Sequence, residues 1–460
     1  HGYEAYAVGG CVRDTMLGRV PGDWDITTSA LPQEIKSVFP KTIDTGIQHG
    51  TVTVMLHHVG YEVTTYRIDG EYEDGRHPKE VTFTRNLQMD LERRDFTINA
   101  MAYNDTTGLV DIFEGVQDLH RGVIRCVGDA GKRFDEDALR MLRAIRFSGQ
   151  LGFTIEEKTC QAIRERAHHL EKISAERIRV ELVKLLVSPG AERLREAYTL
   201  GMTAVFLPEF DRMMQTEQKN PHHIYTVGEH SIQTVKTINA FFAPEQVKKI
   251  QALTDGTKEW ILSVTRSLSE KQHSILSVAG LLHDCAKPEV MTLDEQGIGH
   301  FRGHPEKGRE LARKILHRLT FDNETTDIAG RLILYHDWRM ECTHRAVRRA
   351  VAKIGADIAD MVFLMQYADI LSQNPEGIRE KLARTDRARG IYEQIRAAGD
   401  ALTVKELAVH GKDLIRAGVT PGPQMGVILK ELLEAVLEEP EKNTKESLLT
   451  LAEQKGYISK

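Results

Sequence analysis

The sequence predicts an α+β fold in which a small mixed β-sheet at the amino end precedes a long all-helical body. Residues 1 to about 115 alternate short β-rich runs with helical segments, and the clearest strands are Thr51 to Leu56 and Tyr61 to Tyr66 around the tight connection HHVG. From about residue 130 the pattern is helical almost throughout, with Gly and Pro confined to short loops. At 460 residues with 41% apolar content, the chain should form about two to four domains.

The composition limits the functions that the chain can have. A net charge of −6 argues against a strong non-specific grip on nucleic acid, so any RNA site must be a local basic patch. The five cysteines lack C-x-x-C spacing, which indicates neither a disulfide framework nor a zinc ribbon and favours a reducing, cytoplasmic location. No apolar run approaches the roughly 20 residues that span a bilayer. We expect no membrane association and no obligate protein partner.

The first element is an apolar strand, Ala5 to Val8, which leads into a Gly-Gly turn. Gly9 and Gly10 would let the backbone approach a phosphate chain without a Cβ in the way. Arg13 adds a positive charge that can neutralise the phosphates. An ordinary turn explains Gly-Gly taken alone, but its place between a strand and an acidic motif favours phosphate binding.

The acidic motif is DWDIT, with Asp23 and Asp25 two residues apart. Because side chains alternate along a strand, both carboxylates are expected on one face, where they repel each other unless a cation lies between them. Mg²⁺ suits this position, since it takes one or two carboxylates and completes its coordination with phosphates and water. A solvated acidic loop is the alternative. Glu62 on the later hairpin could supply a third ligand, although a surface acid on an edge strand explains it as well.

Six segments in a fixed order give the chain a resemblance to a known family. They are GGCVRD at 9–14, DWDI at 23–26, DGRHP at 74–78, RRDFTINA at 93–100, EDALRMLRAIRF at 136–147 and ERIRVELVKLL at 176–186. Over essentially its whole length the chain resembles the bacterial class II CCA-adding tRNA nucleotidyltransferases of the polymerase-beta superfamily. The resemblance implies a nucleotidyltransferase head that adds the 3′-terminal CCA to tRNA from CTP and ATP, with no nucleic-acid template and by two-metal chemistry.

The resemblance also assigns roles to residues of RRDFTINA and DGRHP. It implies that Arg94, Asp95 and Asn99 contact the sugar and phosphates of the incoming nucleotide. A helix start capped by Asp95 is the competing structural account of the same segment. In the family, DGRHP belongs to a flexible loop associated with the step from adding C to adding A, so its presence favours the complete activity.

Asp137, Arg140 and Arg143 are expected on one face of a helix over 136–147, where such a stripe is commonly a set of salt bridges. In the family, the same Asp and Arg act as a protein template that reads the base. Cytosine and adenine both present an exocyclic amine beside a ring-nitrogen acceptor, which a carboxylate and a guanidinium can satisfy. Uracil and guanine oppose the carboxylate with a carbonyl, which leaves two acceptors unpaired.

Two pairings are expected around this template. Glu136 and Arg143 should hold the two reading residues in place. On the next helix, Arg177 and Glu181 stand at i, i+4 and are expected to pair as a structural brace carried over from the family.

A second set of histidines and aspartates follows in the carboxyl half. The segments HIYTVGEH, LLHDCAKP, FRGHPEKG, LILYHDW and QYADI resemble, in this order, an HD phosphohydrolase domain. A single histidine on an apolar helix is commonly a core residue, but a whole set in the family's order is not explained in that way. The resemblance implies a divalent transition metal of open identity, and it leaves open hydrolysis of a 2′,3′-cyclic phosphate or a phosphomonoester. The positions that match metal ligands are His230, His283, Asp284 and Asp369, with His304 and His336 as accessory histidines for a second metal.

A basic helical stripe is the candidate for gripping RNA. Arg345, Arg348, Arg349 and Lys353 recur at helical spacing, with no acidic residue from Cys342 to Ala356. A solvated helix face is the alternative. Because the chain as a whole is acidic, this stripe is one of few places that could anchor a tRNA backbone.

These features divide the chain into four expected parts. They are a nucleotidyltransferase head at 1–128, a helical neck with the templating motif at 129–190, a helical body containing the HD domain at 191–375 and a helical tRNA-binding tail at 376–460. Three other functions stay open: a poly(A) polymerase or A-adding enzyme, an HD phosphohydrolase that keeps the transferase motifs for sensing, and a non-catalytic tRNA-binding protein.

Overall fold

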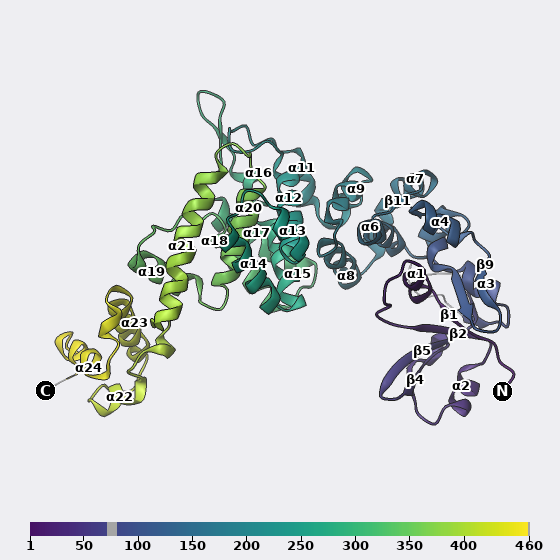
Figure 1. Ribbon diagram of the computed structural model, residues 1–460, viewed down its shortest axis with the longest axis horizontal. Coiled ribbons are helices and arrows are strands. Elements are labelled where there is room, and N and C mark those ends of the chain that lie inside the picture. The colour runs from purple at the N-terminus through teal and green to yellow at the C-terminus, as the bar shows by residue number, and fades with distance from the viewer. Residues whose placement is uncertain (71–80, 459–460) are drawn as a thin grey trace. The chain divides into compact units, whose positions relative to one another are not determined.

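The computed structural model describes residues 1–70 and 81–458, so the DGRHP motif lies outside the described residues (Figure 1). The chain forms two compact units. The first comprises His1–Asp211 with Arg318–Phe321, and the second comprises Arg212–His317 with Asp322–Lys460. The first unit contains the β-sheet and the helices that follow it, whereas the second is almost entirely helical.

A seven-stranded mixed sheet forms the amino-terminal part of the first unit, as the sequence predicts. Its strand order is β3-β4-β5-β2-β1-β8-β9. Strands β2 and β5 run parallel with Asp25 opposite Glu62, and all other neighbours are antiparallel. The strands are β1 (Ala5–Val8), β2 (Asp25–Thr28), β3 (Thr42–Gly46), β4 (Thr51–Leu56), β5 (Val59–Thr65), β8 (Met101–Asn104) and β9 (Gly108–Asp111).

The predicted hairpin is confirmed as β4 and β5. Its two turn residues, His57 and His58, have φ angles of 49° and 67°. Positive φ at both positions matches the turns whose twist follows that of the strands. Strand β5 lies between β4 and β2, so the interpretation of Glu62 as an acid on an edge strand is wrong.

Apolar clusters on the sheet position its chemistry-bearing residues. One cluster surrounds Val52 and Val54, whose side chains point inward from β4 while Thr51 and Thr53 alternate with them. Burying each such valine is worth about 1.5–3 kcal/mol. Helix α2 (Pro32–Val38) packs on β4 and β5 through buried Ile35. Helix α1 (Gly10–Met16) packs on β1 and β8 of this sheet. Two short strand pairs lie outside it, β6 (Arg67–Asp69) with β7 (Val81–Phe83) and β10 (Val123–Ile124) with β11 (Thr154–Ile155). Helix α3 (Leu87–Glu92) contacts β6, and α4 (Gly115–Arg121) contacts β10.

The segment RRDFTINA does not form an amphipathic helix. Residues Thr97–Asn99 make a single 3₁₀ turn whose N-cap is Phe96, and the chain then enters β8. The helix start capped by Asp95 is therefore wrong. Pairing of β8 with β1 and the complete burial of Ile98 and Met101 outweigh the local helical pattern.

The helix expected over 136–147 is broken at Asp137. Helix α5 (Ala130–Glu136) ends before it, Asp137 has φ −147° and ψ 101°, and α6 (Leu139–Leu151) begins after Ala138. The Asp137 carboxylate accepts a hydrogen bond from the Leu139 N–H at 3.1 Å, which competes with a continuous helix. The expectation that Asp137 shares a helix face with Arg140 and Arg143 is therefore wrong. The first unit continues with α7 (Glu157–Arg166), α8 (Ala175–Leu186), α9 (Leu194–Thr199), α10 (Thr203–Phe206) and the start of α11 (Pro208–Gln215).

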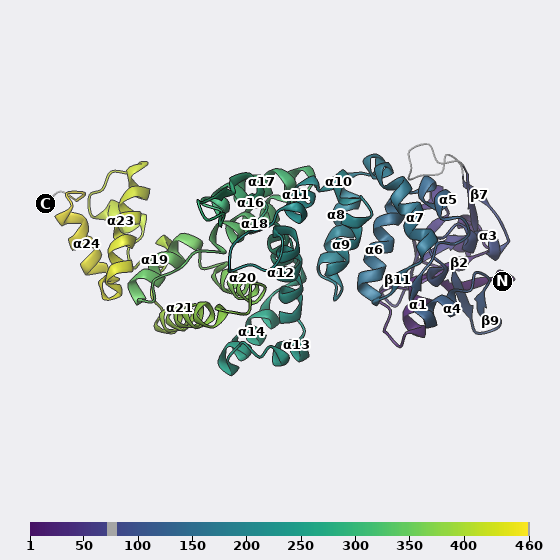
Figure 2. The same ribbon diagram turned by 90° about the horizontal axis from the view of Figure 1, so that it is seen from above.

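The second unit is built around α20 (Ala359–Leu371), which is buried on nearly all sides. Helix α12 (Val227–Phe241) packs against it and lies beside it in Figure 2. Helices α15 (Glu270–Leu282) and α18 (Asn323–Tyr335) complete this core. Around it lie α13 (Pro244–Lys249), α14 (Asp255–Ser267), α16 (Lys287–Val290), β12 (Thr292–Leu293), β13 (Gly299–His300), α17 (His304–Arg318), α19 (His344–Ile354) and α21 (Ile378–Ala398).

The carboxyl-terminal helices have an apolar cluster of their own. It includes Leu414, Leu432, Val436 and Leu448, all fully or almost fully buried. The helices are α22 (Gly411–Arg416), α23 (Gln424–Glu438) and α24 (Lys445–Gln454).

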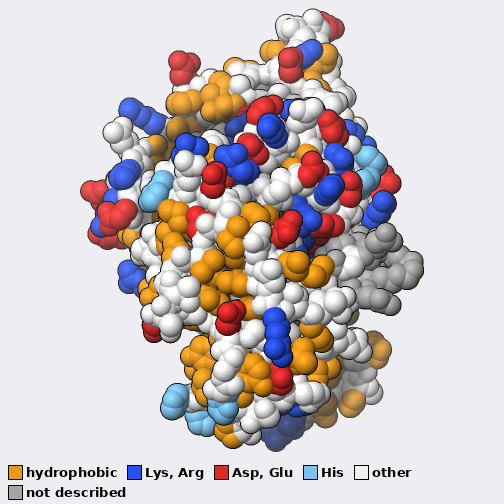
Figure 3. Space-filling view, turned by 90° about the vertical axis from the view of Figure 1, so that its right-hand side faces the viewer, with side chains coloured by type: hydrophobic (Ala, Val, Ile, Leu, Met, Phe, Trp, Pro, Cys, Tyr) orange, Lys and Arg blue, Asp and Glu red, His pale blue; other side chains and the backbone are white. Residues whose placement is uncertain are grey.

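Two surface properties agree with the composition. Among the described helices, none combines the length and apolar character that a membrane crossing requires. On the described part of the face in Figure 3, acidic and basic side chains are interspersed, so no patch of a single sign covers it. On this face, a basic surface for RNA would have to consist of a smaller group of side chains.

Candidate active sites

Asp25 and Glu62 lie side by side at the start of β2 and within β5. Strand β2 begins at Asp25, so Asp23 precedes the strand, and the expected alternation of the two aspartates along one strand is wrong. Burial raises the pKa of Asp25, and the negative charges of Asp23 and Glu62 raise it further. Three carboxylates therefore act on one another at this point of the sheet, and a divalent cation would relieve their repulsion.

Gly9 and Arg94 lie beside these carboxylates. Gly9 has a φ of 78°, and a Cβ there would approach Arg94 Nη1 to 2.9 Å. The glycine thus leaves room for the guanidinium, whose charge lowers the pKa of Asp25 against the effect of burial. Among the described residues, the buried Arg94 Nε has no acceptor. Arg94 Nη2 lies 3.8 Å from Asp90 Oδ2, while its Nη1 borders the space beside Gly9. A guanidinium held in this way beside a glycine turn is suited to receive an anionic oxygen.

Arg13, Asn99, Asp95 and Arg143 form one hydrogen-bonded chain. Arg13 Nη1 donates to Asn99 Oδ1 at 2.7 Å, and Asn99 Nδ2 donates to Asp95 Oδ1 at 3.0 Å. Arg143 Nε donates to Asp95 Oδ2 at 2.8 Å. Although burial opposes it, Arg143 and Asn99 hold the pKa of Asp95 well below its usual range. The structure thus brings these four residues together but places Arg13 inside the network, where it also binds Asp14.

The two base-reading residues have different partners. Arg140 is buried, and its Nη1 donates to Glu136 Oε2 at 2.6 Å, as the expected support by Glu136 requires. Asp137 instead accepts two hydrogen bonds from Arg177, at 3.2 and 2.7 Å. The other expected support, Arg143, binds Asp95 rather than either reader.

The expected pairing of Arg177 with Glu181 is wrong. Glu181 is buried and accepts from Arg146 Nε at 2.5 Å, while Arg177 reaches Asp137. The two residues stand at the right spacing along α8, but both find partners on the preceding segment. Sequence spacing gave no signal of this, because the partners are 40 and 35 residues away.

The side chains expected at the HD site all lie buried in the second unit: His230, His283, Asp284, His304, His336 and Asp369. His230 Nε2 lies 2.8 Å from Asp369 Oδ1 and 3.3 Å from His283 Nε2. Asp284 Oδ2 lies 3.2 Å from His283 Nε2, and its Oδ1 lies 3.4 Å from His304 Nε2. Two groups result, and each has its ligand atoms within 4.8 Å of one another: His230–His283–Asp284 and Asp284–His304–His336. Asp284 is shared by both.

The four imidazoles are oriented by backbone carbonyls. The Nδ1 atoms of His230, His283, His304 and His336 lie 3.2, 2.9, 2.8 and 2.7 Å from the carbonyl oxygens of Ser372, Gly280, Phe301 and Ile333. A neutral imidazole that donates from Nδ1 carries its lone pair on Nε2. All four lone pairs can then face the shared carboxylate, which is the orientation that metal-ligating histidines adopt.

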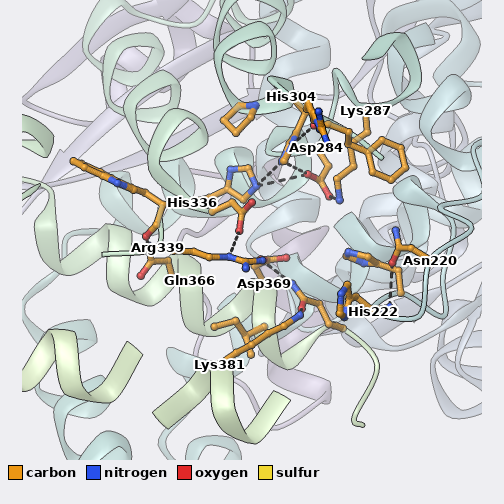
Figure 4. Close-up of a pocket in the computed structure, with 18 of the residues that line it drawn as sticks. Asn220, His222, Asp284, Lys287, His304, His336, Arg339, Gln366, Asp369 and Lys381 are labelled. Carbon is orange, nitrogen blue, oxygen red and sulfur yellow. Dashed lines mark hydrogen bonds and ion pairs between the residues drawn. The ribbon is translucent and has the colours of Figure 1, made fainter. Parts of the chain in front are cut away.

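Lys287 lies against the shared carboxylate of Asp284, and the sequence did not lead us to single it out. Its Nζ lies 2.7 Å from Asp284 Oδ2 (Figure 4). It also donates to Gln218 Oε1 at 2.9 Å. The signal was present in LLHDCAKP, where Lys287 stands three residues after Asp284 at the start of α16.

The basic stripe is only partly open to a ligand, because one of its four residues is buried. Arg348 is only 7% exposed; its Nε donates to the Leu437 carbonyl at 2.9 Å and its Nη1 to Asp400 at 3.1 Å. Arg349 pairs with Glu438 at 2.5 Å, Arg345 pairs with the same carboxylate, and Lys353 lies over the Trp338 ring. Acids that are distant in sequence lie opposite the stripe, and Arg348 is buried against them. Arg345, Arg349 and Lys353 stay exposed, so their contact with RNA stays a prediction. Arg348 caps the carbonyl end of α23.

Four protein-family models match the chain in order. They are the poly(A) polymerase head domain over residues 5–125, a probable RNA- and SrmB-binding site of polymerase A over 152–214, the HD domain over 227–374 and domain 2 of tRNA nucleotidyltransferase over 309–452. The CCA-adding enzyme of Lactiplantibacillus plantarum is 34% identical over 452 residues, which is 98% of this chain and 92% of that protein. The chain belongs to the CCA-adding enzyme family. It is therefore an enzyme of the nucleotidyltransferase class.

Other members of the family extend the similarity. The CCA-adding enzyme of Leuconostoc mesenteroides is 54% identical over 207 residues, or 45% of this chain and 52% of that protein. The crystal structure of the Bacillus stearothermophilus CCA-adding enzyme in complex with CTP superposes with a TM-score of 0.67 at 30% identity, covering 99% of this chain and 94% of that one. The expected architecture of a sheet-based polymerase head and a helical body with an HD domain is confirmed. Both kinds of domain imply the use of divalent metal ions.

Proposed function

We propose that this protein adds the 3′-terminal CCA to tRNA from CTP and ATP, without a nucleic-acid template. The observation that carries the proposal is the placement of Asp25 opposite Glu62, with Asp23 near enough to act on the same carboxyl. The proteins most useful for comparison bear the name CCA-adding enzyme, and one of them is in complex with CTP. A tRNA-processing role also fits the cytoplasmic location that the cysteine pattern favours.

The transfer reaction needs one bond to form and one to break. The tRNA 3′-oxygen bonds to the α-phosphorus of the nucleotide as the bond from that phosphorus to the pyrophosphate oxygen breaks, and the hydroxyl proton leaves to solvent. Asp23, Asp25 and Glu62 offer the oxygen ligands that Mg²⁺ prefers. Two such ions, when bound, would lower the proton affinity of the 3′-hydroxyl and stabilise the leaving pyrophosphate.

The protein's own residues would position the nucleotide. Gly9 keeps the space beside the carboxylates open, and Arg94, whose Nη1 borders that space, would pair with a phosphate oxygen. Asp137 and Arg140 would read the exocyclic amine and ring nitrogen that cytosine and adenine share. The chain Arg13–Asn99–Asp95–Arg143 would hold the ribose side of this pocket rigid, since every member is hydrogen-bonded.

Nucleotide selection gives a direct test of this template. Asp137→Ala should lower the preference for CTP over UTP by about a hundredfold or more, because the unpaired acceptor that rejects uracil is removed. Competition between the two nucleotides in single additions to tRNA measures the preference. Unchanged rejection of UTP would contradict the role of Asp137.

Primer extension separates the proposed activity from its nearest rivals. tRNAs ending at the discriminator base, at C and at CC are supplied with CTP and ATP, separately and together. A CCA-adding enzyme adds C twice and then A in that order. A poly(A) polymerase or A-adding enzyme adds only A, and a tRNA-binding protein adds nothing.

We propose a second activity at the HD site, the hydrolysis of a phosphate ester with a divalent transition metal as cofactor. The convergence of four oriented imidazoles on Asp284 supports it, because such nitrogen and carboxylate ligands suit these metals. His230, His283, Asp284 and Asp369 would hold one ion, and His304 and His336 with Asp284 a second. When bound, the metal would make a water molecule nucleophilic at neutral pH.

The hydrolysis consumes one water molecule, which supplies both the new oxygen on phosphorus and the proton for the leaving group. The water oxygen bonds to phosphorus, the phosphorus–oxygen ester bond breaks, and the departing alcohol oxygen takes up a proton. Release of phosphate from a phosphomonoester, and opening of a 2′,3′-cyclic phosphate, test the proposal. The metal content of the purified protein, measured by elemental analysis, identifies the ion.

A further inference from the structure

The pocket beside the histidine cluster is larger than a single phosphate group requires. Its volume is about 580 Å³, and it opens between the loop before α17, the loop after α18 and helix α21 (Figure 4). This lies within the range of roughly 300–1,000 Å³ typical of sites for whole small molecules. The pocket can therefore hold a nucleotide rather than only its reacting phosphate.

The inner end of the pocket contains candidate metal ligands and a lysine. Asp284 and Asp369 contribute the carboxylates, the imidazoles surround them, and Lys287 is held by Asp284 and Gln218. The phosphate that reacts belongs at this end, because the candidate metal ligands lie here.

The outer end carries three cations, two of which lack an acidic partner among the described residues. Lys381 and Arg384 line it from α21, and Arg339 lines it from the loop after α18. Within residues 1–70 and 81–458, no carboxylate lies within 4 Å of Lys381 or Arg384, while Arg339 has only Asp337 at 3.8 Å and its side chain is 64% exposed. Elsewhere in this unit, basic side chains such as Arg331 and Arg389 have acidic partners at 2.8 and 2.6 Å.

Lys381 is also linked to the inner end. Its Nζ donates to Gln373 Oε1 at 2.5 Å, and Gln373 Nε2 donates to Asp369 Oδ2 at 3.0 Å. Figure 4 shows Lys381 across Asp369 from Asp284 and Lys287. Burial lowers the pKa of Lys381, and the positive charges of Arg339 and Lys287 lower it further against Asp369. Positive charge thus accumulates on the side of the pocket away from the shared carboxylate, where an anion would relieve it.

We propose that Lys381, Arg384 and Arg339 form a second anion subsite, so that the preferred ligand of the HD pocket is a nucleotide with two separated phosphate groups. One phosphate lies at the histidine cluster and the other at these three cations. The chemistry fits a nucleoside 3′,5′-bisphosphate unit, either free or as the 3′-phosphorylated end of an RNA. This inference rests on the phosphate-ester hydrolysis proposed above for the inner end.

Equilibrium binding to the full chain in EDTA tests the subsite without turnover. Adenosine 3′,5′-bisphosphate should bind at least about tenfold more tightly than adenosine 3′-monophosphate, since charge-assisted hydrogen bonds to one more phosphate are gained. Lys381→Met and Arg384→Gln should each remove most of this preference and leave the affinity for the 3′-monophosphate unchanged. Arg387→Gln, an exposed residue of the same helix that does not line the pocket, should preserve it.

A third ligand distinguishes the two sources of the bisphosphate unit. A dinucleotide with a 3′-phosphate should bind more tightly than the free bisphosphate if the pocket is built for an RNA end, and more weakly if it is built for a free nucleotide. Equal binding of the bisphosphate and the 3′-monophosphate, or a preference that both variants retain, would overturn the subsite.

Hydrolysis assays with the metal-loaded protein distinguish a failure of the anion subsite from a failure of the proposed hydrolase activity. If the bisphosphate binds preferentially but no phosphate is released from any ligand, the hydrolase proposal fails and the subsite stands. If the monophosphate and the bisphosphate are hydrolysed with the same KM in wild type and in Lys381→Met, the subsite fails and the hydrolase stands.

Discussion

The two candidate metal sites of this protein are built in opposite ways. In the second unit, nitrogen and oxygen ligands already lie within 4.8 Å of one another, buried and oriented by backbone carbonyls. In the first unit, Asp23 and Glu62 are exposed, and the ligand groups that meet the same distance among the described residues are both in the other unit. We call the first the open site, because two of its three carboxylates are exposed, and the second the closed site, because its ligands are buried and already close together.

The difference follows from what each site must exchange. Mg²⁺ keeps several waters and takes only one or two carboxylates, so a nucleotide's phosphates can complete its coordination. A transition metal held by imidazoles is enclosed by protein, and only the reacting group comes and goes. The open site would therefore acquire its metal with the substrate, whereas the closed site would keep its metal between turnovers.

The largest effect is expected from Asp25→Ala, which would break the open site alone. Nucleotide incorporation should fall by about a thousandfold or more, because the half-buried ligand on β2 is lost. Single-turnover CMP addition measures this, with tRNA affinity and metal content of the HD site expected to stay unchanged. Asp44→Ala, an exposed carboxylate on β3, is the matched control. Retained incorporation in Asp25→Ala would remove the basis of the metal assignment.

The converse change, Asp284→Asn, should break the closed site alone. Bound metal should be lost, and phosphate-ester hydrolysis should fall by about a hundredfold, because the carboxylate shared by both groups is weakened as a ligand. Elemental analysis and phosphate release measure the two effects. CMP incorporation should be unaffected, and Asp327→Asn on the exposed side of α18 should change neither. A parallel loss of both activities would show that the two sites are not separable.

A smaller effect is expected from Arg177, a residue of the first unit that orients another side chain and does not belong to a candidate metal site. Arg177→Ala should reduce discrimination between CTP and UTP by about tenfold, because Asp137 loses the two hydrogen bonds that orient it. Arg177→Lys should restore part of the discrimination by keeping the charge without the paired geometry. Nucleotide competition is the measurement, and KM for CTP should change less than the CTP/UTP ratio.

The smallest effect on activity is expected from Arg348→Ala in the second unit. The free energy of unfolding should fall by about 1–3 kcal/mol, because the carbonyls of Leu437 and Glu438 and the Asp400 carboxylate lose their donor. Thermal unfolding measures this change. The affinity for tRNA should be almost unaltered, and a selective loss of tRNA binding with normal stability would return Arg348 to the RNA surface.

The sequence predicted well wherever local pattern and tertiary structure agree. The β-rich runs Thr51 to Leu56 and Tyr61 to Tyr66 predicted the hairpin, and that hairpin brought Glu62 next to Asp25. The order of histidine motifs predicted a buried cluster. In these segments the local pattern and the tertiary contacts favour the same structure, whereas in RRDFTINA the pairing of β8 with β1 overrides the helical pattern.

The sequence predicted the partners of several charged side chains poorly, although Arg140 binds Glu136 as expected. Helical spacing suggested that Arg177 binds Glu181, but the fold offers Asp137, and Asp137 is there because its carboxylate interrupts the helix. Likewise, nothing near Arg348 indicates the end of α23, which lies about ninety residues later. Ion pairs of similar local geometry differ little in energy, so the fold decides among them.

The Nδ1 contacts of His283 and His336 have one more consequence. Both histidines are the residues that end their helices, α15 and α18, and each imidazole N–H serves a carbonyl that no backbone amide of the helix can reach. Metal binding and fraying of the helix ends therefore involve the same two terminal turns, and each disfavours the other. Loading the ion should slow amide hydrogen exchange there well before it changes the melting of the whole unit, so those turns would report occupancy locally.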